Sequence, residues 1–236
     1  MIAMPRYLQR PPIPISVTVI GAGGTGSMLL THLARINHAL KILDGRELFV
    51  VLIDPDTVSS ANCGRQMFTE ADIGRHKADC LIERVNRFYQ TQWIAINEEA
   101  SINKCSANIV ITCTDTKKSR TKVKKLLKHN ESNHQANNFF WIDCGNEQHI
   151  GQVIIGSKAH NWKPVTDYAG FKKIKAGNNV PSCSLAEALG KQDLFINSWV
   201  ANTAGTWLWQ ALFNKQIDWK GAFFNIKDMT FRKIKA

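Results

Sequence analysis

The sequence contains no C-x-x-C pair, although it has six cysteines, at positions 63, 80, 105, 113, 144 and 183. This spacing excludes a zinc knuckle and a thioredoxin-like redox motif. Several of the thiols lie inside apolar runs, such as Cys113 in IVITCTD and Cys144 in FFWIDCG. A reduced thiol in such a run behaves as a small buried hydrophobe, which is typical of a protein in a reducing cytosol.

Long hydrophobic runs are absent as well. No apolar stretch has the length needed to span a bilayer, and the first residues, MIAMPRYLQRPPIPI, lack the apolar centre of a signal peptide. The prolines in this stretch oppose an amphipathic targeting helix. We therefore expect a cytoplasmic protein that makes no membrane contact.

Acidic residues are scarce, with 19 Asp and Glu against 30 Lys and Arg, which gives a formal net charge of +11. Such a surface attracts anions, whether nucleotides, nucleic acids or an acidic protein. The positive charge is densest between Lys104 and Lys128, where it is typical of one solvated helix face. No aromatic residues are interleaved there for base stacking, so nucleic-acid binding is not favoured.

What the sequence does contain is an alternation of strand and helix patterns. ISVTVIGA predicts a strand, SMLLTHLARI a helix, and LFVVLIDPD a second strand that is buried on both faces. The alternation continues to FFWIDCGNE and QHIGQVIIGS, which predict two strands joined by a short polar turn and therefore antiparallel. We expect an α/β protein with a Rossmann-like, mostly parallel sheet, helices on both faces and an antiparallel C-terminal extension.

A chain of 236 residues with 44% hydrophobic content is expected to form a single domain. Residues 1–15 form an N-terminal arm in this prediction, and residues from about 158 to 182, which have no clear period, form a long surface loop. Residues 183–236 supply C-terminal helices and strands. The tryptophan-rich helix predicted at 193–213 is expected in the core or in a dimer interface, because large aromatic residues favour buried surfaces.

The stretch GAGGTG, residues 21–26, is a glycine loop between the first strand and its helix. Gly21 allows a tight turn, Gly23 lets the backbone approach a pyrophosphate, and Gly26 lets the helix pack closely on the strand. Asp54 ends the next strand, where a carboxylate can accept hydrogen bonds from ribose hydroxyls. A nicotinamide-dependent oxidoreductase uses the same features, and a solvated turn is the simpler interpretation of Asp54 and Asp56.

Residues 54–77, DPDTVSSANCGRQMFTEADIGRHK, contain three spaced elements: D-x-D-x-V, then N-x-x-R-Q, then D-I-G-x-x-K. In order and spacing these resemble the signature of the ThiF/MoeB/HesA family, the ubiquitin-activating-type adenylyltransferases. The CTD at 113–115 is similar to an acid-bearing strand end of that family. The segments PSCSLAEAL and QDLFINSW, together with the short chain, most resemble the ThiF-like proteins of bacterial PRTRC plasmid cassettes.

The resemblance implies an enzyme that uses ATP and Mg²⁺ to adenylate the C-terminal carboxylate of a ubiquitin-fold or sulfur-carrier-like protein. It also implies a homodimer, in a bacterial plasmid or mobile-element cassette. The implied nucleotide-binding residues are Gly21, Gly23, Gly24, Gly26, Asp54, Asp56, Asn62, Arg65, Gln66 and Lys77. The implied catalytic residues are Arg65, Lys77, Asp115 and Cys183.

In that scheme Asp54 holds the ribose, Arg65 and Lys77 face the phosphates, and Asp115 binds Mg²⁺. Each assignment has an alternative. The two cations are otherwise surface residues of a basic protein, and Asp115 is otherwise a strand-end acid paired with Lys117 or Arg120. Cys183 forms a thioester or persulfide, or else it is a packed thiol or part of a capped helix start. A nucleotide-binding partner module without turnover also stays open.

Overall fold

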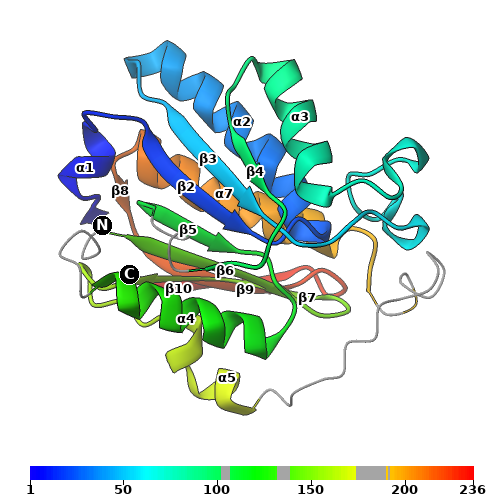
Figure 1. Cartoon of the computed structure of the whole chain (residues 1–236). Helices are drawn as coiled ribbons and strands as arrows, with labels where there is room; N and C mark the ends of the chain where they lie inside the picture. Colours follow the sequence, from blue (N-terminus) through cyan, green and yellow to red (C-terminus); the bar gives the residue numbers. More distant parts are fainter. Residues whose placement is uncertain (102–106, 132–138, 174–189, 191) are drawn as a thin grey trace.

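The computed structural model describes residues 1–101, 107–131, 139–173, 190 and 192–236, and an eight-stranded sheet forms its centre (Figure 1). Across the sheet the strand order is β10-β9-β7-β6-β5-β2-β3-β4. The parallel strands are β2 (Ile15–Ile20), β3 (Leu48–Ile53), β4 (Ile94–Ile96), β5 (Ile109–Thr112) and β6 (Phe140–Asn146). Antiparallel pairing adds β7 (Ile150–Ser157), β9 (Trp219–Asn225) and β10 (Thr230–Lys235).

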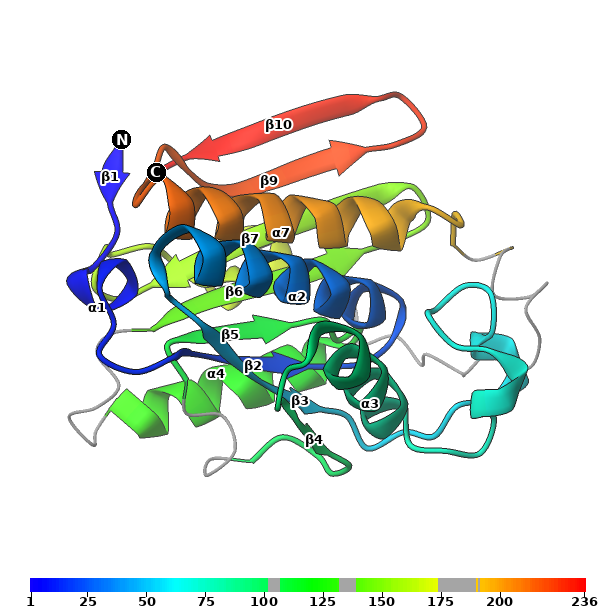
Figure 2. The same ribbon diagram turned by 90° about the horizontal axis from the view of Figure 1, so that it is seen from above.

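Helices cover both faces of this sheet (Figures 1 and 2). On one face lie α2 (Gly24–Asp44), α3 (Lys77–Tyr89) and α7 (Ile196–Phe213), and on the other lie α4 (Lys117–Glu131) and α5 (Ala169–Lys173). The prediction of a mostly parallel Rossmann-like sheet with an antiparallel C-terminal extension is confirmed. No described helix is long and apolar enough to cross a membrane.

Two apolar cores, one on each face, explain why these strands are β-branched and apolar. The larger core joins residues such as Val17 and Leu52 of the sheet to Leu33 of α2. The smaller core lies on the α4 side and includes Val123 and Trp141. Strands buried on both faces have no solvent side, so their sequences run as continuous apolar stretches.

Helix α7 is the tryptophan-rich helix predicted near the C-terminus. Its sequence, INSWVANTAGTWLWQALF, contains no charged residue. Trp207 is fully buried, its Nε1 donates to the Trp219 carbonyl at 2.9 Å, and its ring centroid lies 5.5 Å from that of Phe140. Trp199 by contrast keeps 38% of its surface exposed. The helix therefore ties the parallel part of the sheet to the C-terminal strands.

The N-terminal arm is anchored to the domain. Strand β1 (Ile2–Ala3) pairs with β8 (Gln216–Ile217), and the four-residue helix α1 (Arg6–Gln9) buries Leu8. The predicted long loop differs from expectation over its described part, residues 158–173. This part holds a 3-10 turn at Val165–Asp167 and α5, because Val165 and Phe171 are buried in the smaller core. Helical pieces this short leave no readable period.

The two edges of the sheet are different. Strand β4 at one edge has three residues. Strand β10 at the other edge carries Arg232, Lys233 and Lys235, all exposed, and its pairing with β9 is irregular between Ile234 and Lys235. One edge strand, β4, is therefore short, and the other, β10, is charged and irregularly paired.

Candidate nucleotide-binding site

The topology of the sheet points to one end of it as a binding site. Strand β3 pairs with one side of β2 and β5 with the other, so the strand order reverses at β2. In open parallel sheets, ligands bind beyond the carboxyl ends of the strands at such a reversal. The glycine loop follows β2 at this point, and the Gly21 N–H donates to the Ile53 carbonyl at 2.9 Å.

Three of the loop glycines are required by the fold itself. Gly21 has φ of +102°, and a Cβ there would lie 2.7 Å from the Cys113 carbonyl oxygen. A Cβ on Gly26 would lie 1.9 Å from the Gly21 oxygen, and one on Gly24 would lie 2.5 Å from the Asn197 side chain. At Gly23 a Cβ would meet no atom of the described residues within 4 Å. The open space at Gly23, the N-cap of α2, leaves room for a ligand against the backbone.

Asp54 joins the glycine loop to the end of β3. Its Oδ2 accepts a hydrogen bond from the Ala22 N–H at 2.6 Å, and its Oδ1 accepts one from the Asp56 N–H at 2.9 Å. The side chain is buried, and burial raises the pKa of this carboxyl, although the two backbone hydrogen bonds and nearby Lys77 oppose the rise. Asp54 is therefore a structural support of the loop as well as a candidate acceptor for ribose hydroxyls.

Lys77 lies beside this carboxyl. It is the first residue of α3, and its side chain is only 9% exposed. Its Nζ lies 3.1 Å from the Asp56 Oδ2, and its N–H donates to the Asp56 carbonyl. Asp56 itself is mostly exposed. The structure thus brings Asp54, Asp56 and Lys77 together at the glycine loop, and the interpretation of Lys77 as a mere surface cation is wrong.

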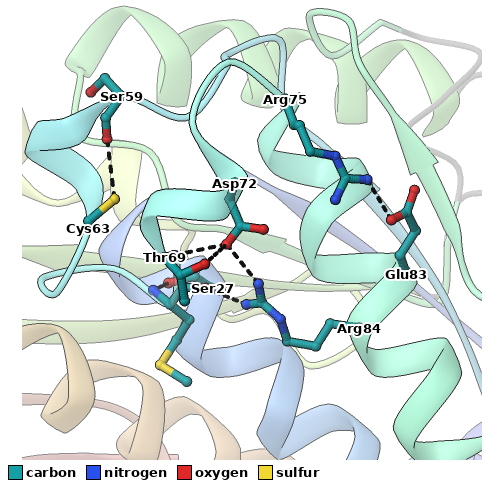
Figure 3. A network of polar contacts seen from close by, with 9 residues as sticks. Ser27, Ser59, Cys63, Thr69, Asp72, Arg75, Glu83 and Arg84 are labelled. Atoms are coloured by element: carbon teal, nitrogen blue, oxygen red, sulfur yellow. Dashed lines mark hydrogen bonds and ion pairs between the residues drawn. The ribbon is translucent and has the colours of Figure 1, made fainter.

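The segment between Asp56 and Lys77 is fastened to α2 and α3 (Figure 3). The Met67 N–H donates to the Ser27 hydroxyl, and Arg84 donates both to the Met67 carbonyl and to the Asp72 carboxylate. Asp72 also accepts a hydrogen bond from the Thr69 N–H. These contacts hold the N-x-x-R-Q stretch in a defined position near the glycine loop.

Asn62, predicted to face the phosphates, has a local partner. Its Oδ1 accepts hydrogen bonds from the N–H and hydroxyl of Ser59, which closes a capping box around the 3-10 turn Ser60–Asn62. The S-x-x-N spacing differs from the usual S/T-x-x-E/Q capping box in that Asn takes the place of Glu or Gln. Gln66 is buried, and its Oε1 has no hydrogen-bond partner in the described part of the chain.

Arg65 is half-buried, with its Nη1 3.0 Å from the Gln192 Oε1. Burial lowers the pKa of Arg65, and the charge of nearby Asp115 opposes this effect. The Arg65 Nε and the Thr114 Oγ1 are buried and, among the described residues, have no hydrogen-bond partner. Polar atoms buried in this way are usually satisfied by a ligand or by ordered water.

A set of amide side chains at this site was not predicted from the sequence. The amides of Asn146, Gln192 and Asn197 are hydrogen-bonded to one another, to the Thr25 hydroxyl and, through Gln192, to Arg65. With Thr25, they come from α2, the end of β6, the segment before α7 and the start of α7. No motif relates segments so far apart in the chain, so the only sequence indication was their position at the ends of predicted elements.

Asp115 is exposed just beyond β5. It is not paired with Arg120, because that guanidinium binds buried Asp143 at 2.9 Å. Within the described residues no group of three or more His, Cys, Asp or Glu could hold a metal ion. One carboxylate still fits Mg²⁺ in a nucleotide site, where phosphate oxygens and waters complete the shell. Cys183 lies outside the described residues.

Comparisons with known proteins identify the family. The family model for ThiF matches residues 14–236. The chain belongs to the ThiF family. This ThiF-family chain matches the crystal structure of PaaA with a TM-score of 0.62 and 14% identity, covering 94% of this chain and 64% of that one. It matches E. coli MccB with a TM-score of 0.63 and 14% identity, covering 94% and 62%.

MccB has also been solved with ATP, and that structure matches with a TM-score of 0.60 and 14% identity, covering 94% of this chain and 63% of that one. At this identity the likeness concerns the fold, which is Rossmann-like in all of them. The chain spans less than two thirds of the length of these structures. No curated protein matches the sequence.

Proposed function

We propose that this protein binds Mg²⁺-ATP and adenylates the C-terminal carboxylate of a ubiquitin-fold or sulfur-carrier-like protein. The observation that carries the proposal is the glycine loop at the sheet reversal, held by buried Asp54 and flanked by buried Lys77. ThiF-family membership and the fold shared with MccB, which has been solved with ATP, support it.

The nucleotide would bind across the carboxyl ends of β2, β3 and β5. The first N–H groups of α2 and the bare backbone at Gly23 suit the phosphates, because a helix N-terminus presents free donors and partial positive charge. Asp54 has lone pairs left for ribose hydroxyls beside its two backbone hydrogen bonds. The Lys77 ammonium, which is ion-paired with Asp56, supplies a cation with little exposure to water.

In the proposed reaction a carboxylate oxygen of the acceptor attacks the α-phosphorus. The bond from that phosphorus to the bridging oxygen breaks, and pyrophosphate leaves with the electron pair. Two anions must approach each other, so the residues chiefly neutralise charge and align the reactants. Arg65 and Lys77 would do this from two sides. Asp115 would hold Mg²⁺, which supplies further neutralisation of phosphate charge.

The proposal extends to a homodimer in the cytoplasm and to a place in a PRTRC-type plasmid cassette. The sequence resemblance supports the cassette, and the uncharged helix α7 with its partly exposed Trp199 supports a protein interface on a chain of net charge +11. A later thioester or persulfide step on Cys183 is part of the same scheme.

Exchange of [³²P]pyrophosphate into ATP tests the function. With Mg²⁺ and ubiquitin-fold proteins encoded beside the gene, we expect exchange that is lost in Asp115→Ala and kept in Cys183→Ala. The cysteine variant is the control, because it removes a group used only after adenylation. Tight ATP binding with no exchange would instead support a binding module without turnover, and preferential binding of NADH would support an oxidoreductase.

A further inference from the structure

Three amide side chains at the candidate site form a closed ring of hydrogen bonds. Gln192 Nε2 donates to the Asn146 Oδ1 at 2.9 Å, Asn146 Nδ2 donates to the Asn197 Oδ1 at 2.8 Å, and Asn197 Nδ2 donates to the Gln192 Oε1 at 3.0 Å. We call these three residues the amide ring. Each member donates to the next, so no member can be reversed alone without placing two donors or two acceptors face to face.

The ring has one contact to each side of the proposed phosphate site. On one side the Gln192 Oε1 also accepts a hydrogen bond from Arg65 Nη1 at 3.0 Å. On the other side the Asn197 Oδ1 accepts one from Thr25 Oγ1 at 3.0 Å, and a Cβ on neighbouring Gly24 would meet Asn197 at 2.5 Å. The ring therefore spans from the glycine loop to the Arg65 guanidinium.

We propose that Gln192 is a positioning residue that orients Arg65 toward the nucleotide phosphates, with the amide ring fixing the direction in which its oxygen points. Arg65 cannot donate to a reversed Gln192, because the amide NH₂ would then face the guanidinium. Within the part of the chain that the structure describes, the Gln192 oxygen is the hydrogen-bond partner of the Arg65 side chain, through Nη1, and the buried Nε has none there. This inference rests on the proposed function, in which Arg65 contacts the phosphates.

A double-mutant cycle on Mg²⁺-ATP affinity tests the inference by isothermal titration. Gln192→Met keeps the length of the side chain and removes both hydrogen-bonding atoms. We expect it to weaken Mg²⁺-ATP binding about tenfold, the range of one hydrogen bond to a charged group. In an Arg65→Ala background, Gln192→Met should weaken Mg²⁺-ATP binding no further. The affinity for adenosine, which has no phosphate, should be the same in the unchanged protein and in Gln192→Met. Gln92→Met, at an exposed glutamine, is the matched control.

The outcomes separate the two proposals. If Arg65→Ala leaves Mg²⁺-ATP affinity unchanged, the phosphate role of Arg65 fails, and the positioning role fails with it. Suppose instead that Arg65→Ala weakens Mg²⁺-ATP binding. Only the positioning role is then overturned if Gln192→Met leaves the affinity unchanged, if the effect of Gln192→Met persists in the Arg65→Ala background, or if Gln192→Met also weakens adenosine binding. Thermal unfolding checks that each variant is folded, and Gln192→Asn, which retracts the amide by one methylene, replaces Gln192→Met if that variant does not fold.

Discussion

Gly23 and Gly26 lie in the same loop but differ in what surrounds them. Among the described residues no atom lies within 4 Å of a Cβ placed on Gly23, and its φ of −73° is negative, whereas a Cβ on Gly26 would overlap the Gly21 carbonyl oxygen. At the scale of single residues, Gly26 is therefore required by the fold, whereas Gly23 is expected to be required by the ligand.

We predict that Gly23→Ala weakens Mg²⁺-ATP binding about tenfold or more, because the methyl group occupies space needed by a phosphate. Its cost in stability should be about 1 kcal/mol, the value for an alanine at a helix N-cap. Gly26→Ala should cost about 3 kcal/mol or prevent folding. Urea unfolding and calorimetric titration measure the two effects, and a Gly23→Ala variant with normal ATP affinity would contradict the proposed phosphate position.

Asp54 predicts a pH dependence. Its pKa is raised in the folded state, chiefly by burial, so it takes up a proton at higher pH than an ordinary aspartate of pKa about 3.9. Protonation removes an acceptor, so Mg²⁺-ATP affinity should fall as the pH is lowered, starting above the ordinary range. The difference in affinity between the protein and Asp54→Asn, followed from pH 8 to pH 4.5, isolates this titration from that of ATP. If the difference in Mg²⁺-ATP affinity between the two proteins stays constant over this pH range, Asp54 is not the group that causes the pH dependence.

At the scale of elements, α4 is joined to the sheet by a buried ion pair. Arg120 of α4 donates to both oxygens of Asp143 in β6, and Thr112 of β5 donates to the same carboxylate at 2.7 Å. Both charged side chains are buried. Breaking such a pair costs more than the pair contributes, because the remaining charge is left without a partner.

We therefore predict that Arg120→Met lowers the free energy of unfolding by about 3–5 kcal/mol in urea. Burial already raises the pKa of Asp143, and loss of Arg120 raises it further. A carboxyl with a raised folded pKa contributes its stability below the unfolded pKa and loses it as the pH rises through the folded value. The variant should thus be more stable at pH 5 than at pH 8. Arg120→Met with Asp143→Leu should recover part of the loss, and no recovery would argue against an uncompensated charge.

The strands and long helices were predictable because each carries its own period or apolar run, as in LFVVLID for β3. The glycine loop, Asp54 and Lys77 were predictable because a motif fixes their spacing. The amide ring was not, since Asn146 meets Gln192 and Asn197 only after two distant segments of the chain have folded together. The capping role of Asn62 was not predicted, and its contact with the phosphates stays a prediction.

At the scale of the whole molecule, α7 connects the parallel and the antiparallel parts of the sheet, and we expect the two parts to unfold together for this reason. The prediction of a single domain over residues 1–236 has a direct test in its unfolding. Trp207 contacts β6 through Phe140 and β9 through the Trp219 carbonyl, so the parallel and antiparallel parts of the sheet share one buried side chain.

We predict one cooperative unfolding transition, with circular dichroism and tryptophan fluorescence giving the same midpoint. Trp207→Ala should lower the free energy of unfolding by about 3–5 kcal/mol and shift both probes equally. Trp199→Ala, at a partly exposed position of the same helix, is the control and should cost much less. Two separate transitions would contradict the single-domain prediction.

The edges of the sheet have a consequence for the protein at high concentration. An open edge strand offers unpaired N–H and C=O groups to any neighbouring chain, and such pairing leads to aggregation. Here β10 presents Arg232, Lys233 and Lys235 with an irregular register, and β4 offers three residues. Two copies that approach through β10 meet like charges before any backbone hydrogen bond forms. The same lysines and arginine that make the chain basic thus keep its sheet from growing by addition of strands from other copies.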